Sequence, residues 1–525
     1  MHYVVGSGPA GVSCAQALLA RGLRVTMLDA GLALDPEREA QLQRLQSQPP
    51  ETWRGDADQF LKDGMESGSS GIPLKLAYGS DYPYRVPPGA AQVEFESADA
   101  SPSYAFGGLS TVWGSAVMPY HPRDMTHWPI TASDLEEGYR AVCRWMPFSA
   151  VSDDLASSFP LFCDSPDPMP LSRQASGMLR DLDRHKHRLN QQGVSFGTAR
   201  IAVAAQGFHG SPACVACGLC MYGCPYRLIY STDRTVGEMQ ADPNFTYIPS
   251  VVVRSVEEKG SGVTIVATDT ANNQKKFQGD RVYLAAGLYS TTAILLHSLH
   301  LYDHPVRFFD SQYFLLPALR FSGAGRVTQE KLHTLAQLSL EVMDPAISPH
   351  TIHLQTYTYN DLFVAPIEKS LGPLRPLFPL QQFLSRLILF QGYLHSSHSA
   401  QLEATLVRRG ADDVLHVTGH SQPETRATLK KLIRKLLALS PSLRAAPLIP
   451  LLQIGKPGRG YHSGGTFPMR ANPGAGETDI YGRPAGFSRI HAVDSTIFPS
   501  IAATTITYTA MANAWRIGSA VASYS

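Results

Sequence analysis

The chain begins with a short apolar run that ends in a glycine-rich turn. Residues 2–5 (His-Tyr-Val-Val) predict a strand, and small or apolar residues at helical spacing from 12 to 19 predict a helix. Residues 23–28 (Leu-Arg-Val-Thr-Met-Leu) predict a second strand, which an acid follows directly. Strand, glycine turn, helix, strand and acid in this order, within about 30 residues, are typical of a dinucleotide-binding unit.

The turn itself reads Gly-Ser-Gly-Pro-Ala-Gly from residue 6 to residue 11. Gly6 permits the tight turn, Gly8 lets the backbone approach a diphosphate, and Gly11 lets the helix pack closely on the strand. The phosphates would lie at the helix N-terminus, beside Pro9 and Ala10, where unpaired N–H groups and the helix dipole favour negative charge.

The acid after the second strand is Asp29, followed by Ala30. Its carboxylate would accept a hydrogen bond from the ribose hydroxyls of an adenosine. The glycine turn alone does not separate FAD from NAD, whereas an acid at this position argues against NADP.

The pattern changes along the rest of the chain. Residues 32–100 are rich in Pro, Gly and Ser and predict a linker and lid over the nucleotide site. Apolar and polar residues alternate within 334–365, which predicts an antiparallel sheet. Residues 371–390 are largely apolar, with only two arginines charged, and predict either a buried helix or an apolar rim that touches a membrane or an apolar substrate.

Composition narrows the class of protein. The chain has 525 residues, enough for two or more domains, and its 44% apolar and 17% charged residues are ordinary for a globular protein. Its 45 basic and 44 acidic residues leave no electrostatic footprint for nucleic acid. The start lacks the pattern of a secretory signal, and no apolar run of about 18 residues occurs. We therefore expect a cytoplasmic protein, open to peripheral membrane contact or to export with a partner subunit.

Four of the seven cysteines fall within eleven positions: Cys214, Cys217, Cys220 and Cys224, the last followed by proline. This is the spacing of a bacterial ferredoxin motif, so we expect an iron–sulfur cluster of the 4Fe-4S or 3Fe-4S type. Three arrangements are open. Cys224 is the fourth ligand, Cys143 or Cys163 supplies it from elsewhere, or three thiolates hold a three-iron cluster. The rivals are a structural zinc ion, which usually takes two separated ligand pairs, and plain thiols.

Five further motifs resemble those of the glucose-methanol-choline (GMC) oxidoreductases. They are residues 106–114 (Phe-Gly-Gly-Leu-Ser-Thr-Val-Trp-Gly), 128–130 (Trp-Pro-Ile), 281–287 (Arg-Val-Tyr-Leu-Ala-Ala-Gly), 461–466 (Tyr-His-Ser-Gly-Gly-Thr) and 493–499 (Val-Asp-Ser-Thr-Ile-Phe-Pro). The resemblance favours FAD over NAD. It implies that the backbone of Val253 pairs with the adenine and that the flavin is lined by Gly107, Gly108, Ser110, Trp113, Gly114, Ala286, Gly287, Asp494, Thr505 and Ile506.

The box at 461–466 implies that His462 is the catalytic base. Oxidation of an alcohol removes the hydroxyl proton as hydride leaves the carbon, and a histidine, with an ordinary pKa of about 6.5, can accept that proton near neutral pH. The family usually supplies a second His or Asn further on, where this chain has Thr505, or Thr504 if the register shifts by one. A threonine hydroxyl can orient a substrate oxygen but is no base at this pH, which argues against a two-histidine mechanism.

Three other histidines lie near predicted site segments. His395 and His398 fall on a predicted strand, where residues three apart point to opposite faces, so at most one faces the substrate. His491, just before the Val-x-Asp stretch, is expected to be structural.

The predicted fold is α/β, with a Rossmann-like FAD-binding domain and a substrate domain built on an antiparallel sheet. The FAD-binding parts are expected at 1–135, 246–300 and 456–525. A substrate-domain segment with the cysteines is expected at 136–245, and the main substrate domain at 301–455.

The expected activity is a dehydrogenase that oxidises a sugar, polyol or related CH–OH substrate at FAD. Electrons would leave through the cluster to a one-electron acceptor protein or a quinone. Two alternatives are open: a biosynthetic tailoring oxidoreductase with a structural cluster, and a non-catalytic electron-transfer flavoprotein.

Overall fold

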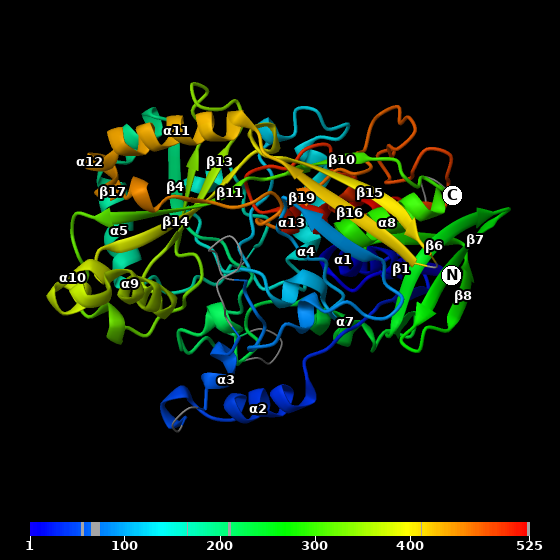
Figure 1. The fold of residues 1–525 in the computed structure, drawn as a ribbon, viewed down its shortest axis with the longest axis horizontal. Helices are drawn as coiled ribbons and strands as arrows, with labels where there is room; N and C mark the ends of the chain where they lie inside the picture. Colours follow the sequence, from blue (N-terminus) through cyan, green and yellow to red (C-terminus); the bar gives the residue numbers. More distant parts are fainter. Residues whose placement is uncertain (54–56, 65–73, 165, 208–211, 411, 522–525) are drawn as a thin grey trace.

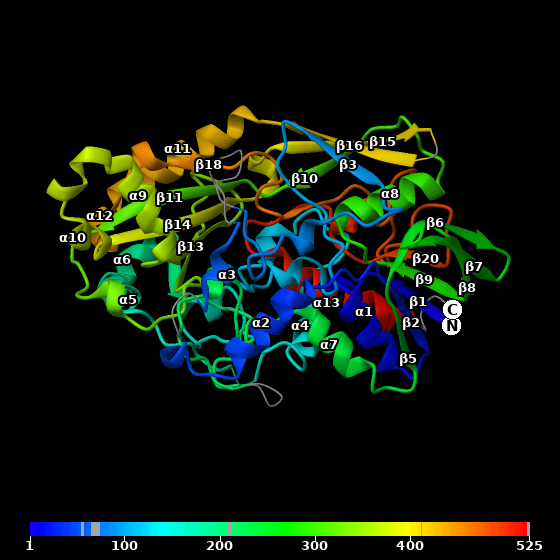
Figure 2. The ribbon, with the colours of Figure 1, turned by 60° about the horizontal axis from the view of Figure 1, so that its bottom comes forward.

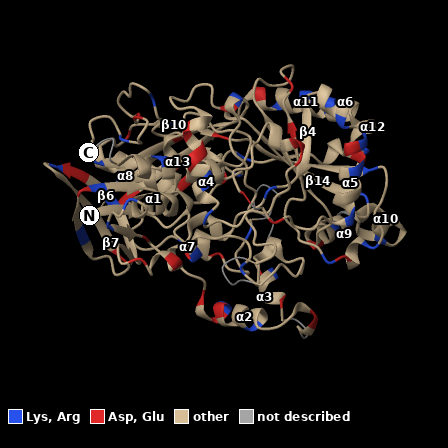
Figure 3. Ribbon diagram, turned by 180° about the vertical axis from the view of Figure 1, so that it is seen from behind, with Lys and Arg blue, Asp and Glu red and all other residues tan. Residues whose placement is uncertain are grey.

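The computed structural model describes residues 1–525 except 54–56, 65–73, 165, 208–211, 411 and 522–525. A parallel sheet with its helices occupies one end of the long axis, and a large antiparallel sheet occupies the other (Figure 1). Figure 2 shows the connecting segments between them, with the amino-terminal and carboxyl-terminal helices side by side. Acidic and basic residues are interspersed over the outer helices and strands (Figure 3).

The parallel sheet has five strands, and every neighbouring pair in it is parallel. Their order is β20 (Ile490–Ala492), β9 (Arg281–Leu284), β1 (His2–Val5), β2 (Val25–Leu28) and β5 (Phe245–Ile248). The strands β2 and β9 are buried at every position, as expected where helices cover both faces of a parallel sheet. The predicted Rossmann-like domain is therefore confirmed.

Small residues let the helices of this half approach one another closely. Helix α1 (Pro9–Leu19) packs on α13 (Ile506–Ser519), which also packs on α4 (Glu136–Val142). A Cβ on Gly518 would lie 2.9 Å from the Cys14 carbonyl oxygen, and a Cβ on Gly138 would lie 2.3 Å from the Ala512 carbonyl oxygen. These contacts fix the carboxyl-terminal segment against the glycine turn.

The second half is an antiparallel sheet. Its order is β17 (Ala445–Pro447), β11 (Tyr313–Arg320), β14 (Leu387–Leu394), β13 (Ile352–Tyr357), β12 (Leu338–Val342) and β4 (Val194–Thr198), with β18 (Gln453–Ile454) also paired to β11. One face packs in an apolar core with α5 (Arg173–Arg184), α11 (Pro423–Ala438) and α12 (Ser440–Leu443). Alternate residues therefore point away from this core, toward the parallel sheet.

Two further sheets contain the remaining strands. One is ordered β19 (Ser463–Gly464), β10 (Val306–Asp310), β15 (Gln401–Arg409), β16 (Asp412–His420) and β3 (Gln92–Glu96); the other is ordered β6 (Val251–Lys259), β7 (Gly262–Asp269) and β8 (Gln274–Gly279). The remaining helices are α2 (Pro36–Gln46), α3 (Gln59–Lys62), α6 (Lys186–Gln191), α7 (Thr232–Met239), α8 (Leu288–Ser298), α9 (Val364–Leu371) and α10 (Leu380–Leu384). No helix in the described part of the chain is both long and apolar enough to cross a bilayer.

Two sequence predictions are wrong in detail. Residues 371–390 do not form one buried helix: a 3-10 turn, the short helix α10 and the start of strand β14 divide the run, because prolines interrupt it. His395 and His398 do not lie on a strand, since β14 ends at Leu394 and a 3-10 turn from Ser396 to His398 follows. The predicted antiparallel pair within 334–365 is present as β12 and β13.

Candidate active site

A cavity of about 440 Å³ lies between the parallel sheet and the seven-stranded sheet. Its lining begins at the glycine turn after β1 and at the carboxyl end of β2, and it ends at side chains of β11, β13 and β14. The carboxyl ends of parallel strands are where open α/β sheets bind ligands. The cavity is therefore the candidate active site.

The glycine turn forms the first end of the cavity. A Cβ on Gly6 would lie 2.4 Å from the Ala285 carbonyl oxygen, and one on Gly11 would lie 2.0 Å from the Gly6 carbonyl oxygen. A Cβ on Gly8, by contrast, would meet no atom within 4 Å. Gly8 is the N-cap residue of helix α1 and has no side chain that could accept from the first N–H groups of the helix. These groups are therefore free to bind a ligand in the cavity, which the start of the helix lines. This cradle fits the diphosphate of a dinucleotide.

A second glycine loop closes over the first one. A Cβ on Gly108 would lie 3.2 Å from the Cα atom of Gly8, so the two loops are nearly in contact. Ser7 Oγ accepts from the Gly107 amide at 2.9 Å, and Thr232 Oγ1 donates to the Ser7 carbonyl at 2.8 Å. The hydroxyl of Ser110 donates to the Gly107 carbonyl at 2.6 Å. The loops therefore hold each other in place without any ligand.

Asp29 lines the cavity at the end of β2 and is buried. It accepts hydrogen bonds from Ser7 Oγ at 2.5 Å and from Tyr247 Oη at 3.0 Å. Burial raises the pKa of this carboxyl to about 6, although the hydrogen bonds from Ser7 and Tyr247 act in the opposite direction. Hydroxyl donors beside the cavity thus stabilise its ionised form, and that form can accept from a ribose.

Most of the predicted cofactor-binding residues meet at this cavity. Those that line it are Gly6, Gly8, Pro9, Ala10, Asp29, Ala30, Gly108, Ser110, Trp113, Gly114, Val253, Ala286, Gly287, Asp494, Thr505 and Ile506. Gly11 and Gly107 do not line it: a Cβ on Gly11 would lie 2.0 Å from the Gly6 carbonyl oxygen, and a Cβ on Gly107 would lie 3.1 Å from the Asp233 amide nitrogen. Asp494 accepts from the Gly287 amide at 3.0 Å and from Thr291 Oγ1 at 2.6 Å, which ties its loop to the start of α8.

His462 lines the cavity near the seven-stranded sheet. Its ring stacks on Tyr393 with 4.6 Å between centroids and 24° between planes, and its Nδ1 atom is buried without a hydrogen-bond partner among the described residues. Burial, and then the charge of nearby His353, lower the pKa of His462 to about 3. The imidazole is therefore neutral near pH 7 and can accept a proton.

A buried carboxyl group holds the loop that presents His462. Asp310 at the end of β10 accepts from the Gly458 amide at 2.9 Å and from Ser463 Oγ at 2.8 Å. The strand pair β10–β19 also places Ser463 opposite Asp310. The position of the histidine is thus fixed by main-chain pairing and by one carboxylate.

The structure separates the two threonine registers. Thr505 is the N-cap residue of α13 and lines the cavity, whereas Thr504 is fully buried away from it. The Oγ1 atom of Thr505 has no partner among the described residues. A hydroxyl beside the same cavity as His462 can orient a substrate oxygen, as the sequence suggested for Thr505.

Sequence reasoning missed the wall that faces His462. Its members come from three adjacent strands and are Tyr313 on β11, Gln355 and Tyr357 on β13, and Gln391 and Tyr393 on β14. Register places Tyr313 opposite Tyr393, and Gln391 opposite Gln355. The alternation of residues 351–359 could have singled out Gln355 and Tyr357. The other members carried no signal, because the strands that hold them were not predicted.

The four clustered cysteines form a compact loop beside the cavity. Burial, and then the neighbouring thiols of Cys220, Cys224 and Cys214, raise the pKa of Cys217 to about 12. Backbone amides donate to sulfur, from Ala216 to Cys214 Sγ at 3.4 Å and from Leu228 to Cys224 Sγ at 3.3 Å. Crowded thiols of this kind remain protonated unless a cation lies among them, and amide donors to sulfur are typical of iron–sulfur sites.

The two distant cysteines lie elsewhere. Cys143 Sγ lies 3.1 Å from Tyr508 Oη, and its hydrogen bond with Cys163 is the first cause that raises its pKa. The thiols that raise the pKa values of Cys214, Cys217 and Cys224 are members of the clustered group itself.

A half-buried lysine lies between the cysteine loop and the cavity. Lys75 lines the main cavity together with Met221 of the cysteine loop, and it also lines a neighbouring cavity that Cys224 borders. Its ammonium donates to the Trp113 carbonyl at 2.8 Å, and no described carboxylate forms an ion pair with it. Burial lowers its pKa to about 8, and Cys220 and Cys224 act against that shift.

The remaining candidate histidines do not line the cavity. His395 stacks on His350, His398 lies 3.0 Å from Ser348 Oγ through its Nε2 atom, and His491 stacks on Tyr283. Neither His395 nor His398 lines the cavity, and the strand geometry from which their roles were predicted is absent.

The sequence matches no protein-family profile and no curated protein. Solved structures with the same fold include three that match nearly the whole chain. Pyridoxine 4-oxidase from Mesorbium loti is 14% identical, with a TM-score of 0.58 over 100% of this chain and 99% of that one. A variant of Aspergillus oryzae formate oxidase, solved to study FAD modification, is 12% identical, with a TM-score of 0.58 over 98% and 97%. A further formate oxidase structure gives a TM-score of 0.56 at 12% identity, over 98% and 97%. The chain thus has the fold of the GMC oxidoreductases.

Proposed function

We propose that this protein is an FAD-dependent oxidoreductase that oxidises the CH–OH group of an alcohol, a sugar or polyol by preference. The observation that carries the proposal is one cavity with a diphosphate cradle at one end and His462 with Thr505 at the other. The likeness to two oxidases, one of them described with FAD, supports the same cofactor here.

The residues divide into a group that would hold FAD and a group that would handle the substrate. Gly8 and the N-terminus of α1 would bind the diphosphate, Asp29 the ribose, and Val253 the adenine. Bound FAD would supply the oxidant, accepting two electrons and the carbon-bound hydrogen of the alcohol. Both groups of residues line one cavity, so FAD and the substrate could lie side by side in it.

His462 would accept the hydroxyl proton, since its imidazole is neutral and its ring lines the cavity. Thr505 would donate to the substrate oxygen and align it. Gln355 and Gln391 supply amide groups beside the tyrosine rings, a lining that suits several hydroxyl groups on one substrate. This wall supports an enzyme over a pure electron carrier, which needs no such pocket.

We further propose that Cys214, Cys217, Cys220 and Cys224 hold an iron–sulfur cluster that passes electrons singly to a protein or quinone acceptor. Lys75 supports this: desolvation of its half-buried ammonium is costly without an anion nearby, and a thiolate-bound cluster is anionic. A single zinc ion fits less well, because no three of these thiols are among the described ligand groups that lie within 4.8 Å of one another.

Anaerobic mixing with candidate sugars and polyols tests the enzyme proposal. Loss of the flavin absorbance on mixing with one of them is the expected result, and a flavin that no alcohol reduces would refute it.

Iron and acid-labile sulfide analysis tests the cluster, with Cys220→Ser expected to lose iron and Cys143→Ser to retain it. Lys75→Met should retain iron but lower the potential of the cluster, because a nearby positive charge stabilises the reduced form.

A further inference from the structure

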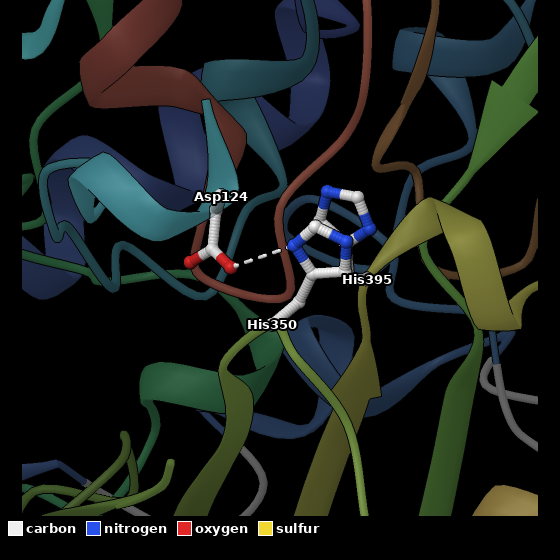
Figure 4. A group of neighbouring side chains, drawn as sticks. All are labelled: Asp124, His350 and His395. Atoms are coloured by element: carbon white, nitrogen blue, oxygen red, sulfur yellow. Dashed lines mark ion pairs between the residues drawn. The ribbon is translucent and has the colours of Figure 1, made fainter. Parts of the chain in front are cut away.

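Three side chains of metal-binding type meet outside the cavity. Asp124 ends a 3-10 turn, His350 lies in the connection from β12 to β13, and His395 follows β14. One ligand atom of each lies within 4.8 Å of the other two. Figure 4 shows the carboxylate of Asp124 facing the two imidazole rings. They come from segments far apart in sequence, so the fold and not a local motif brings them together.

Two polar atoms of this cluster are buried without a partner among the described residues. Asp124 is 1% exposed, and its Oδ2 atom accepts no hydrogen bond. His395 is 4% exposed, and its Nε2 atom is likewise unpartnered. The other carboxylate oxygen accepts from the Thr351 amide at 2.9 Å and lies 3.6 Å from His350 Nδ1. Because unpartnered polar atoms are rare in protein interiors, this pair points to a missing cation.

We propose that Asp124, His350 and His395 bind one divalent cation, with Zn²⁺ preferred, as a structural site. Two imidazoles and one carboxylate are ligands that zinc and related transition metals favour, whereas calcium and magnesium prefer oxygen alone. The role is structural because none of the three side chains lines the main cavity. This inference does not depend on the function proposed above.

The rings must adjust when the ion binds. His350 and His395 lie face to face, with 3.6 Å between centroids and 12° between planes, so their nitrogen lone pairs do not converge. His350 is the ring expected to turn, because its side chain is 12% exposed. His395 Nδ1 accepts from the Ser397 amide at 3.1 Å and lies 3.0 Å from Ser397 Oγ; for Nε2 to bind the ion, Nδ1 must take the ring proton and donate it to Ser397 Oγ instead. Such a polar partner usually orients a metal-bound histidine.

The site would fasten the segment that leads to Thr505. Ser500 Oγ donates to the Asp124 carbonyl at 3.2 Å and accepts from Trp128 Nε1 at 2.8 Å. Ile501 and Ser396 exchange two further hydrogen bonds, at 2.8 and 3.0 Å. A cation shared by Asp124 and His395 would therefore clamp residues 500 and 501 from both sides.

The difference in zinc content between the wild type and site variants tests the proposal. Wild-type protein, Asp124→Asn, His395→Gln and His297→Gln are treated with chelator, given ZnCl₂, desalted and analysed for metal. His297 is the matched control, since it pairs with Asp413 at 2.6 Å without a second imidazole. Wild type and His297→Gln should each bind one equivalent more than the other two, whatever the cysteines bind. Equal zinc in all four proteins would overturn the proposal.

A second measurement needs no variant to fold. X-ray absorption at the zinc edge of the wild type, recorded with the cysteine loop in its native state, should show a nitrogen and oxygen shell without sulfur for one equivalent. ZnCl₂ should also raise the thermal midpoint of chelated wild type. Sulfur ligands for all bound zinc, or an unchanged midpoint, would refute the site.

Discussion

The two ends of the cavity are built from different material. At the glycine end, main-chain groups of Gly6, Gly8 and Gly108 form the wall, and their local conformation determines its shape. At the sheet end, side chains from β11, β13 and β14 form it, and the pairing of distant strands determines which of them meet. A wall made of main-chain groups can be predicted from a short sequence motif. A wall made of side chains can be predicted only when the pairing register of the strands is known.

This difference assigns the two ends separate tasks. The glycine end offers N–H groups and space, which suits a part of the ligand common to all dinucleotide cofactors. The sheet end offers a neutral imidazole, hydroxyls and amides, which suit a particular substrate. Substitutions at one end should therefore leave the task of the other end intact.

The largest effect is expected from His462→Gln. Loss of the base should slow anaerobic flavin reduction about 100- to 10,000-fold, because glutamine cannot accept the hydroxyl proton. FAD content should stay at the wild-type value, since the glycine end is untouched. Stopped-flow absorbance with saturating substrate measures the rate, and a rate within threefold of wild type would remove His462 from the chemistry.

Substitutions at the glycine end should change FAD binding or stability instead of the chemical rate, and a matched pair of them tests this. Gly8→Ala meets open space, so it should preserve the stability of cofactor-free protein but weaken FAD binding about tenfold or more. Gly11→Ala would place its Cβ 2.0 Å from a carbonyl oxygen and should lower the free energy of unfolding by about 1–3 kcal/mol. Urea unfolding and FAD titration of apoprotein distinguish the two; equal behaviour would contradict the separate roles.

A smaller effect is expected from the sheet wall. Gln391→Leu removes an amide that faces the cavity and should raise KM about tenfold, with the limiting rate of flavin reduction changed less than threefold. Its neighbour across the strands, Gln355→Leu, tests the same wall from β13. If both variants instead lost FAD and kept KM, the division between the two ends would be wrong.

The last prediction is that the rate of flavin reduction does not depend on pH between 5 and 8. A lowered pKa of about 3 keeps His462 neutral, and so active as a base, at all pH values above that. The rate of flavin reduction should therefore not fall as the pH drops from 8 to 5. An ordinary histidine would lose half its activity near pH 6.5. A decline centred there would show that the cavity does not shield the ring.

The limits of sequence-based prediction follow from the same contrast. The strand β1, the glycine turn, helix α1 and the end of β2 were predictable because each depends on neighbours within a few residues. His462 was found through a motif that holds it on a main-chain loop. Tyr313, Gln391 and Tyr393 could not be found, because their common face exists only once β11 and β14 pair.

The errors have local causes. Pro373, Pro376 and Pro379 break the first half of 371–390 into short helical turns, which overall hydrophobicity does not show. His395 was placed on a strand because the preceding residues are apolar, although a serine-rich turn begins there. Lys75 could not be predicted as a site residue, because it falls in a segment with the composition of a linker and only the structure shows that it lines two cavities.

Cofactor stoichiometry tests the central claim most directly. Protein purified without added flavin is denatured, and the released FAD is separated and quantified against protein concentration, so that colour from a metal cluster does not interfere. One FAD for each chain, or full uptake by apoprotein on addition, is the result that the cavity predicts. Protein that contains no FAD and does not bind it when offered would contradict the assignment of the cavity.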